Sequence, residues 1–135
     1  MKEKILVVGG TGFIGYHVLK NISSKKYLLY SLSKNKPTEE KKIKNVKYLY
    51  SDITKYKNLK KKLSENFDHV INLSGYIDHS KKKENILCHY FGSKNLIDIF
   101  KLKKIKTFIQ IGSSLEYGNL KSPQIEKKNC KPVSW

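Results

Sequence analysis

The stretch VVGGTGFIGYHVLK, residues 7–20, joins an apolar run to a helical pattern through a loop rich in glycine. The run that leads into it, KILVVG at residues 4–9, is almost continuously apolar, as expected of a strand buried on both faces. Gly9, Gly12 and Gly15 have the spacing G-x-x-G-x-x-G between that strand and the helix. A glycine triplet in this strand-turn-helix context predicts a nucleotide-binding loop rather than a merely structural turn.

The three glycines and the start of the helix have separate expected tasks. One glycine permits the tight turn, the next lets the backbone approach a pyrophosphate, and the last allows close packing of the helix on the strand. We expect free N–H groups of Gly12, Phe13 and Ile14, aided by the helix dipole, to hold the phosphates. The predicted phosphate loop consists of Gly9, Thr11, Gly12, Phe13, Ile14 and Gly15.

Short apolar runs alternate with helical patterns along the chain, which is typical of βα units and a parallel sheet. Five strands are predicted, at residues 4–9, 27–33, 46–52, 69–75 and 107–114. A lysine-rich stretch around Pro37, predicted to be a loop or a short helix, separates the second strand from the third.

Three helices are predicted between these strands. Ile14, Val18 and Ile22 recur every four residues and form the expected apolar stripe of the first helix. Residues 56–63 supply a short amphipathic helix. The buried side of a longer helix is expected to comprise Leu87, Phe91, Leu96, Ile99 and Phe100.

The length and the order of these elements restrict the fold. With 135 residues the chain forms one domain at most. Right-handed crossovers then favour an α/β fold with a doubly wound parallel sheet and the strand order 3-2-1-4-5. In that order the carboxyl ends of the first and fourth strands flank the switch point, where we expect a ligand to bind.

The charge of the chain permits a nucleic-acid partner but does not favour one. The formal net charge is +17, and all 28 basic residues are lysine. Arginine, which is absent, has the planar fork best suited to phosphate and guanine. We therefore expect the lysine runs at 60–62 and 81–83 to be solvated, and we keep a lysine-rich nucleic-acid-binding protein as the less favoured alternative.

The sequence gives no indication of a membrane span or a metal site. Its longest apolar runs are far too short to cross a membrane, and the N-terminus leads into the first strand without a signal peptide. A soluble cytoplasmic protein is expected. Cys88 and Cys130 lie far apart, and neither the cysteines nor the histidines have the spacing of metal ligands.

The glycine loop GGTGFIG, residues 9–15, resembles the cofactor loop of the extended short-chain dehydrogenase/reductases, the branch that contains nucleotide-sugar epimerases, dehydratases and reductases. The resemblance implies a Rossmann fold and covers essentially the whole chain. It continues at SDIT, where Asp52 would accept a hydrogen bond from the adenine amine and Ile53 would offer an apolar edge. Considered alone, Asp52 could instead cap the following helix.

The segment NLSG after the fourth predicted strand also resembles the family, which places short side chains there because the cofactor lies against the backbone. The residues implied are Leu73, Ser74 and Gly75. Considered alone, this segment could be an ordinary turn.

The coenzyme implied is NAD or NADP, and the end of the second strand favours NADP. NAD-selective sites usually present Asp or Glu there to bind the ribose hydroxyls. SLSKNK, residues 31–36, instead has Ser33 and Lys34 and no carboxylate before Glu39. A hydroxyl followed by an ammonium attracts a 2′-phosphate.

The segment IGSSLEYG, residues 111–118, resembles the family's fifth-strand segment, in which a serine or threonine four positions before the tyrosine hydrogen-bonds the substrate. That residue is Ser113, the candidate catalytic residue. Ser114 is the neighbouring alternative, and a strand-end serine with no catalytic role is the other. His89 stands where the family often has Asn, and we interpret it as a packing substitution, with a hydrogen bond near the active site as the alternative.

The segment KPVSW, residues 131–135, resembles the family's approach to a tyrosine that moves a proton with the help of the lysine in Y-x-x-x-K. We therefore expect the chain to be truncated before the last strands and the substrate domain, and to be inactive alone. The complete protein would act on a nucleotide sugar by hydride transfer at a sugar carbon. A homodimer is considered because the family often dimerises through helices. The alternative function on the same fold is a non-catalytic NAD(P)-binding sensor.

Overall fold

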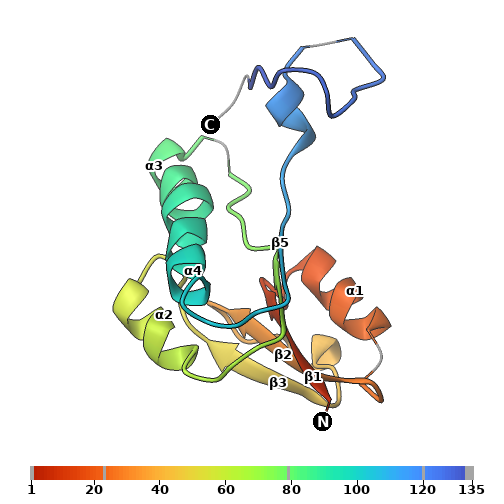
Figure 1. Cartoon of the computed structure of the whole chain (residues 1–135), viewed down its shortest axis with the longest axis vertical. Helices are drawn as coiled ribbons and strands as arrows, with labels where there is room; N and C mark the ends of the chain where they lie inside the picture. The colour runs from red at the N-terminus through yellow and green to blue at the C-terminus, as the bar shows by residue number, and fades with distance from the viewer. Residues whose placement is uncertain (1, 23, 79, 120, 133–135) are drawn as a thin grey trace.

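The computed structural model describes residues 2–22, 24–78, 80–119 and 121–132. At its centre lies a five-stranded sheet in the order β3-β2-β1-β4-β5, in which every neighbouring pair is parallel (Figure 1). The strands are β1 (Glu3–Val8), β2 (Tyr27–Ser33), β3 (Val46–Tyr50), β4 (His69–Asn72) and β5 (Thr107–Gln110). The predicted doubly wound fold and its strand order are confirmed.

β1 ends one residue earlier than predicted, at Val8, and three further strands end earlier by two to four residues. The predictions ran to residues 52, 75 and 114, whereas β3, β4 and β5 end at Tyr50, Asn72 and Gln110. Each of these strands ends where its neighbour ends, because the main-chain hydrogen bonds require a partner. Ser33 is opposite Tyr50, and Asn72 is opposite both Val8 and Gln110. The residues that follow form loops at the carboxyl edge of the sheet.

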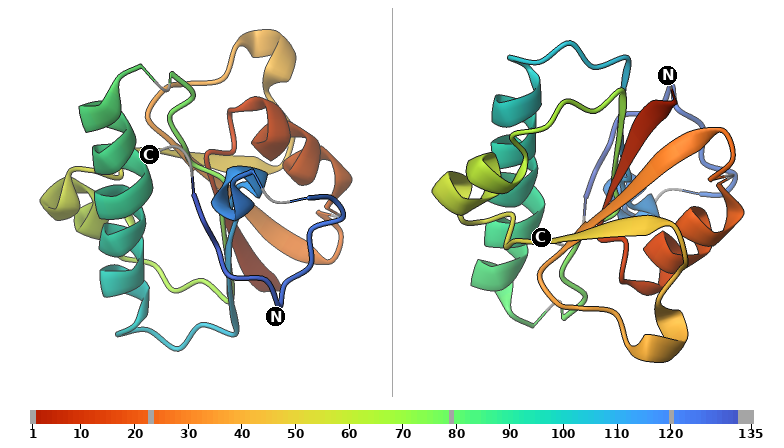
Figure 2. Two further views of the ribbon diagram at one scale, coloured as in Figure 1. Left: turned by 90° about the horizontal axis from the view of Figure 1, so that it is seen from above. Right: turned by 90° about the horizontal axis from the view of Figure 1, so that it is seen from below.

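Helices cover both faces of the sheet. α1 (Phe13–Asn21) lies on one side, and α2 (Tyr56–Lys62) lies on the other together with a longer helical segment (Figures 1 and 2). That segment consists of α3 (Lys82–Asn85), a π-helix η2 (Ile86–Gly92) and α4 (Ser93–Phe100). Two 3-10 turns complete the structure, η1 (Glu39–Lys41) between β2 and β3 and η3 (Ser114–Tyr117) after β5.

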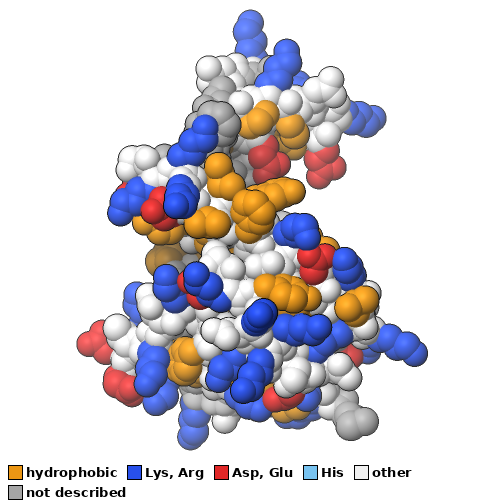
Figure 3. Space-filling model, turned by 90° about the vertical axis from the view of Figure 1, so that its left-hand side faces the viewer, with side chains coloured by type: hydrophobic (Ala, Val, Ile, Leu, Met, Phe, Trp, Pro, Cys, Tyr) orange, Lys and Arg blue, Asp and Glu red, His pale blue; other side chains and the backbone are white. Residues whose placement is uncertain are grey.

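The longer helical segment buries only part of its predicted side. Leu96, Ile99 and Phe100 are at most 3% exposed, but Leu87 is 39% and Phe91 is 46% exposed. The prediction was wrong for Leu87 and Phe91, because the wider turn of η2 shifts the phase of the side chains and η2 leads away from the sheet (Figure 1). Hydrophobic side chains therefore gather among lysines on the side of the molecule that carries α2 and α3 (Figure 3).

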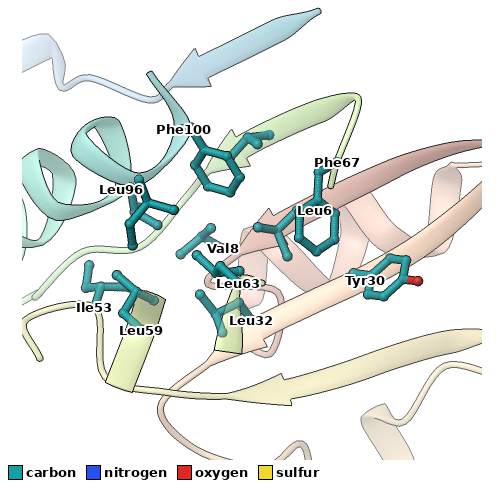
Figure 4. Close-up of a cluster of buried hydrophobic side chains, with 12 residues drawn as sticks. Leu6, Val8, Tyr30, Leu32, Ile53, Leu59, Leu63, Phe67, Leu96 and Phe100 are labelled. Atoms are coloured by element: carbon teal, nitrogen blue, oxygen red, sulfur yellow. The ribbon is translucent and has the colours of Figure 1, made fainter. Parts of the chain in front are cut away.

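Two apolar clusters fill the space between the sheet and its helices. β1 contributes to both, since Leu6 and Val8 face one side and Ile5 and Val7 face the other. The smaller cluster combines Ile5 and Val7 with Leu19 and Leu29. The larger cluster contains Leu6, Val8, Tyr30, Leu32, Ile53, Leu59, Leu63, Phe67, Val70, Leu96, Ile99 and Phe100 (Figure 4). Burial of both faces explains the continuous apolar run in β1.

α1 packs on the sheet through Gly15 and Leu19, its two buried residues. Val18 and Ile22 contact the smaller cluster as predicted, but Ile14 is 58% exposed. The predicted stripe was therefore wrong at Ile14. The line of contact runs through Gly15 and Leu19, and Ile14 lies about 100° around the helix from Gly15.

One carboxylate connects the first three strands near their amino ends. Glu65 accepts hydrogen bonds from Lys47 Nζ on β3 at 2.7 Å, from Lys4 Nζ on β1 at 2.9 Å and from the Tyr30 hydroxyl on β2 at 3.0 Å. These hydrogen bonds, with that from Lys47 the largest cause, lower the pKa of Glu65 from 4.5 to about 2. The cluster is separate from the loops at the carboxyl edge.

Candidate functional site

The loops that follow β1 and β4 touch each other at Gly9. This residue has a φ of +82°, and its N–H donates to the carbonyl of Leu32 at 2.7 Å. A Cβ at this position would lie 2.9 Å from the carbonyl carbon of Leu73 and 2.9 Å from the nitrogen of Ser74. Only glycine satisfies both the left-handed conformation and the close approach. The predicted phosphate loop and the predicted NLSG segment are therefore neighbours at the switch point.

Gly15 brings α1 against the same loop. A Cβ on Gly15 would overlap the carbonyl oxygen of Gly9 and would lie 2.6 Å from the Cα of Gly10. Gly10 was not among the predicted site residues, yet a Cβ there would lie 2.9 Å from Leu19 Cδ1 and would overlap Ser31 Oγ. Its position directly after Gly9 is the signal in the sequence that could have identified it.

The start of α1 presents main-chain donors to open space. Gly12 is the N-cap, and a Cβ on it would have only one close neighbour among the described residues, the carbonyl oxygen of Gly9 at 3.2 Å. The N–H groups of Phe13 and Ile14 have no hydrogen-bond partner in the described part of the chain. The prediction was wrong for the N–H of Gly12, because it donates to the carbonyl of Gly9 at 3.0 Å.

Among the described residues, no acidic side chain or side-chain cap neutralises the positive end of α1. Its first turn has no acidic residue, and no side chain in the described segments accepts a hydrogen bond from its N-terminal N–H groups. Phe13, the first residue of the helix, is 78% exposed. Free donors, open space and the helix dipole together fit a bound diphosphate.

Thr11 connects the glycine loop to the end of β2 through two hydrogen bonds. Its N–H donates to Ser33 Oγ at 3.1 Å, and its hydroxyl donates to the carbonyl of Asn35 at 3.4 Å. Ser33 itself is buried. The stretch predicted to recognise the coenzyme ribose is therefore anchored to the phosphate loop.

Asp52 lies directly beyond β3, with its carboxylate held from two directions. Oδ1 accepts from the N–H of Thr54 at 2.9 Å and from its hydroxyl at 2.7 Å, while Oδ2 lies 3.3 Å from Lys34 Nζ. Partial burial raises the pKa of Asp52, but the hydrogen bonds from Thr54 and Lys34 outweigh it and lower that pKa below its usual value. The N-cap of α2 is Lys55, so Asp52 does not cap that helix.

Ile53, the other predicted adenine contact, lies largely inside the protein. It is 7% exposed and belongs to the larger core cluster. Its side chain packs so closely on Gly92 that a Cβ there would overlap it, and Asn95 Nδ2 donates to its carbonyl at 2.9 Å. The loop after β3 is thereby tied to the helical segment.

Asn72 is a connecting residue that the sequence did not single out. It is completely buried at the end of β4, and its Nδ2 donates to Gln110 Oε1 at 2.7 Å and to Ser93 Oγ at 3.2 Å. Its Oδ1 accepts from the N–H of Ser74 at 3.1 Å and from the Ser74 hydroxyl at 2.5 Å. The available signal was a polar residue directly after the apolar residues Val70 and Ile71 of this strand.

His89 holds the loop that begins with the NLSG segment. Its ring packs on Gly75, where a Cβ would lie 2.8 Å from His89 Cε1. Its Nε2 lies 3.0 Å from the nitrogen and 3.1 Å from the oxygen of Tyr76, so it hydrogen-bonds the main chain. The interpretation as a packing substitution was therefore incomplete.

Ser113 lies in the exposed loop between β5 and η3, beyond the carboxyl edge of the sheet (Figure 1). Its Oγ accepts from the N–H of Leu115 at 3.2 Å, and its own N–H donates to Glu116 Oε1 at 2.8 Å. These bonds form a capping box for η3 and leave the hydroxyl proton of Ser113 for another acceptor. Ser114 is the first residue of η3.

The described residues contain no group of three His, Cys, Asp or Glu side chains placed to hold a metal ion. None of the helices in the described segments is long and apolar enough to span a membrane. The predicted tyrosine approach KPVSW includes residues 133–135, which lie outside the described residues.

Comparison with known proteins identifies the family. The model of the NAD dependent epimerase/dehydratase family matches residues 5–134. The chain belongs to this family. A search of curated protein sequences finds no match.

Solved structures share the epimerase fold with this chain. The enzyme WbmG of Bordetella bronchiseptica, in complex with NAD and UDP, has a TM-score of 0.87 at 17% identity over 99% of this chain and 45% of its own. The UDP-Glc/GlcNAc 4-epimerase of Campylobacter jejuni has a TM-score of 0.87 at 20% identity over 98% of this chain and 44% of its own.

An epimerase of the methanogen Methanothermobacter thermautotrophicus has a TM-score of 0.82 at 20% identity over 93% of this chain and 40% of its own. This member of the epimerase/dehydratase family therefore spans less than half the length of the solved structures that it resembles.

Proposed function

We propose that this chain is the coenzyme-binding part of an NAD(P)-dependent enzyme that transfers a hydride at a carbon of a nucleotide sugar. The observation that carries the proposal is the open space at Gly12, in front of the unpaired N–H groups of Phe13 and Ile14. Membership of the epimerase/dehydratase family supports it. The similar structures with NAD, UDP and UDP-glucose support the coenzyme and the substrate class.

The residues of the chain would share the binding of the coenzyme. The main chain at Phe13 and Ile14 would hold the diphosphate, and the absence of a side chain at Gly12 leaves space for it, while Gly9 and Gly15 allow the surrounding main-chain segments to pack closely. Asp52 would accept a hydrogen bond from the adenine amine beside Ile53, and the coenzyme would lie against the main chain of residues 73–75. When bound, the coenzyme supplies a nicotinamide ring that accepts or returns a hydride.

The choice between the two coenzymes depends on the end of β2. Lys34 is an exposed cation beside the predicted ribose position, with no carboxylate on its own loop before Glu39. A 2′-phosphate would gain a charge-assisted hydrogen bond there. We therefore propose NADP as the preferred coenzyme.

Ser113 would orient the substrate. Its oxygen already accepts from Leu115, so its hydroxyl proton can be donated to a hydroxyl or carbonyl oxygen of the sugar. The residues that move the proton, a tyrosine and a lysine, are expected beyond residue 135. We therefore propose that this chain alone has no turnover, and that further chain decides between epimerisation, dehydration and reduction.

Association into a homodimer is part of the proposal. Ile86, Leu87, Tyr90 and Phe91 are between 38% and 63% exposed on η2. Hydrophobic side chains gather among lysines on the face shown in Figure 3. An apolar surface of this kind is typical of a protein interface. Sedimentation equilibrium of the chain tests this, and a monomer at all concentrations would contradict it.

The binding test is a calorimetric titration of the 135-residue chain with NAD and with NADP, each repeated at two salt concentrations. We expect one site per chain and a tighter complex with NADP. A tighter complex with NAD would contradict only the coenzyme preference. Retention of DNA or RNA with steep salt dependence, without binding of either dinucleotide, would instead favour the nucleic-acid alternative.

A second measurement separates the enzyme from a non-catalytic sensor on the same fold. The gene downstream of codon 135 should encode the tyrosine and lysine in Y-x-x-x-K. A complete protein that binds the dinucleotide but lacks this pair would be a sensor.

A further inference from the structure

An ion pair joins the two loops that would flank the adenosine half of the coenzyme. Lys34 Nζ lies 3.3 Å from Asp52 Oδ2, and the side chains are 74% and 25% exposed, respectively. Thr54 fixes the other carboxylate oxygen with two hydrogen bonds, at 2.9 and 2.7 Å. Asp52 is therefore the fixed end of the pair, and the ammonium of Lys34 is the end that can turn toward a ligand.

The main chain also holds both residues in place. The N–H of Ser51 donates to the carbonyl of Ser33 at 3.1 Å, which joins the residues immediately before Asp52 and Lys34. The N–H of Thr11 donates to Ser33 Oγ at 3.1 Å and connects this point to the glycine loop. The ion pair is thus built into the rim of the site.

We propose that Asp52 is a specificity-determining residue that narrows the preference for NADP over NAD by neutralising Lys34, an inference that rests on the proposed function. In the free chain, the ammonium that would meet a 2′-phosphate already has a carboxylate partner, so the phosphate gains less from it. The carboxylate also repels the phosphate, which carries nearly two negative charges.

NAD experiences neither effect, because it lacks the 2′-phosphate. The adenine contact of Asp52 is the same for both coenzymes and cancels in a comparison of their affinities. The preference for NADP over NAD therefore depends on Asp52, which acts on the 2′-phosphate through its ion pair with Lys34. The wild-type chain should accept both coenzymes with affinities that differ by less than about tenfold.

The test compares the dissociation constants of NAD and NADP for the 135-residue chain and for four variants, one of them a control, measured by calorimetry. Asp52→Asn removes the charge but keeps an oxygen for Thr54. We expect it to raise the preference for NADP by about three- to tenfold, the effect of one charge a few ångströms from a phosphate in partly screened water. Lys34→Gln should lower the preference, and Asp52→Asn should have a smaller effect when combined with it.

Lys25→Gln is the matched control, because it removes the same charge from an exposed residue near the amino end of β2. It should leave the preference unchanged. An unchanged preference in Asp52→Asn, with both dinucleotides bound, overturns this inference and leaves the proposed function intact. An equal effect of Lys25→Gln and Lys34→Gln also overturns it, because net charge would then be the cause.

Lys34→Gln provides a second test if Asp52→Asn disturbs the turn that Asp52 forms with Thr54. Because the Lys34 side chain is largely exposed, its replacement should not disturb the fold. If Lys34→Gln prefers NADP as strongly as the wild type does, this result alone overturns the inference. Failure of the wild-type chain to bind either dinucleotide would remove the proposed function, and this inference with it.

Discussion

Replacement of Gly15 by alanine tests how closely α1 packs against the glycine loop. The new Cβ would overlap the carbonyl oxygen of Gly9 and would lie 2.6 Å from the Cα of Gly10. Both neighbours are main-chain atoms that cannot rotate away, so the helix and the loop must separate. Overpacking of this kind costs about 1–3 kcal/mol, and the better helix propensity of alanine offsets at most about 1 kcal/mol.

We therefore expect Gly15→Ala to lower the free energy of unfolding by about 1–2 kcal/mol. The midpoint of thermal unfolding should fall by about 3–7 °C for a chain of this size. Circular dichroism at 222 nm, recorded against temperature, measures this. An unchanged midpoint would refute the packing argument.

Gly12→Ala is the matched control, because its Cβ would meet only the carbonyl oxygen of Gly9, at 3.2 Å. The backbone of Gly12, with φ −74° and ψ 174°, is accessible to alanine. We expect the free energy of unfolding to fall by only about 0.5–1 kcal/mol, the cost of alanine in place of glycine at an N-cap. Binding of NAD and NADP should nevertheless fall by about tenfold or more, because the methyl group occupies the space proposed for the diphosphate. Wild-type affinity in this variant would disprove the placement of the phosphates.

Three further substitutions probe contacts away from the glycine loop. Glu65→Gln should be less stable than the wild type by on the order of 1 kcal/mol above pH 5, since a partly exposed ion pair is screened by water. Because the folded pKa of Glu65 is depressed from 4.5 to about 2, that difference should disappear as the pH falls through this range, and a difference that persists at pH 2 in urea unfolding would contradict it. Asn72→Ala should lower the free energy of unfolding by about 1–2 kcal/mol, measured in urea, because it removes the hydrogen bonds that a fully buried side chain makes to Ser74, Ser93 and Gln110; a loss below about 0.5 kcal/mol would contradict the connecting role. His89→Ala should raise the hydrogen exchange rate of the Tyr76 N–H roughly fivefold while global stability changes little, and unchanged exchange would show that the ring does not hold this loop.

The sequence alone determined the layout of the chain. Strand and helix periodicities are local, so the alternation of βα units and the strand order followed from short windows and from the handedness of crossovers. The glycine loop was equally predictable from the spacing of its glycines. At Gly9 and Gly15 neighbouring main-chain atoms lie so close that no residue with a Cβ fits.

Local patterns failed where neighbours decide the outcome. Leu87 and Phe91 fit a helical stripe, but they lie in the π-helix η2, which changes the phase, and both are more than a third exposed. Ile14 also fits a stripe, yet the contact of Gly15 with the glycine loop sets the rotation of α1 about its axis.

The connections within the site were decided only by the tertiary structure. Asn72 reaches Gln110, His89 reaches Tyr76, and Lys34 reaches Asp52. The members of each pair are separated along the chain, and a sequence pattern gives residue types but not the distance between two side chains. Folding of the parallel sheet brings the ends of distant strands to one edge, and this placement gives the polar residues their partners.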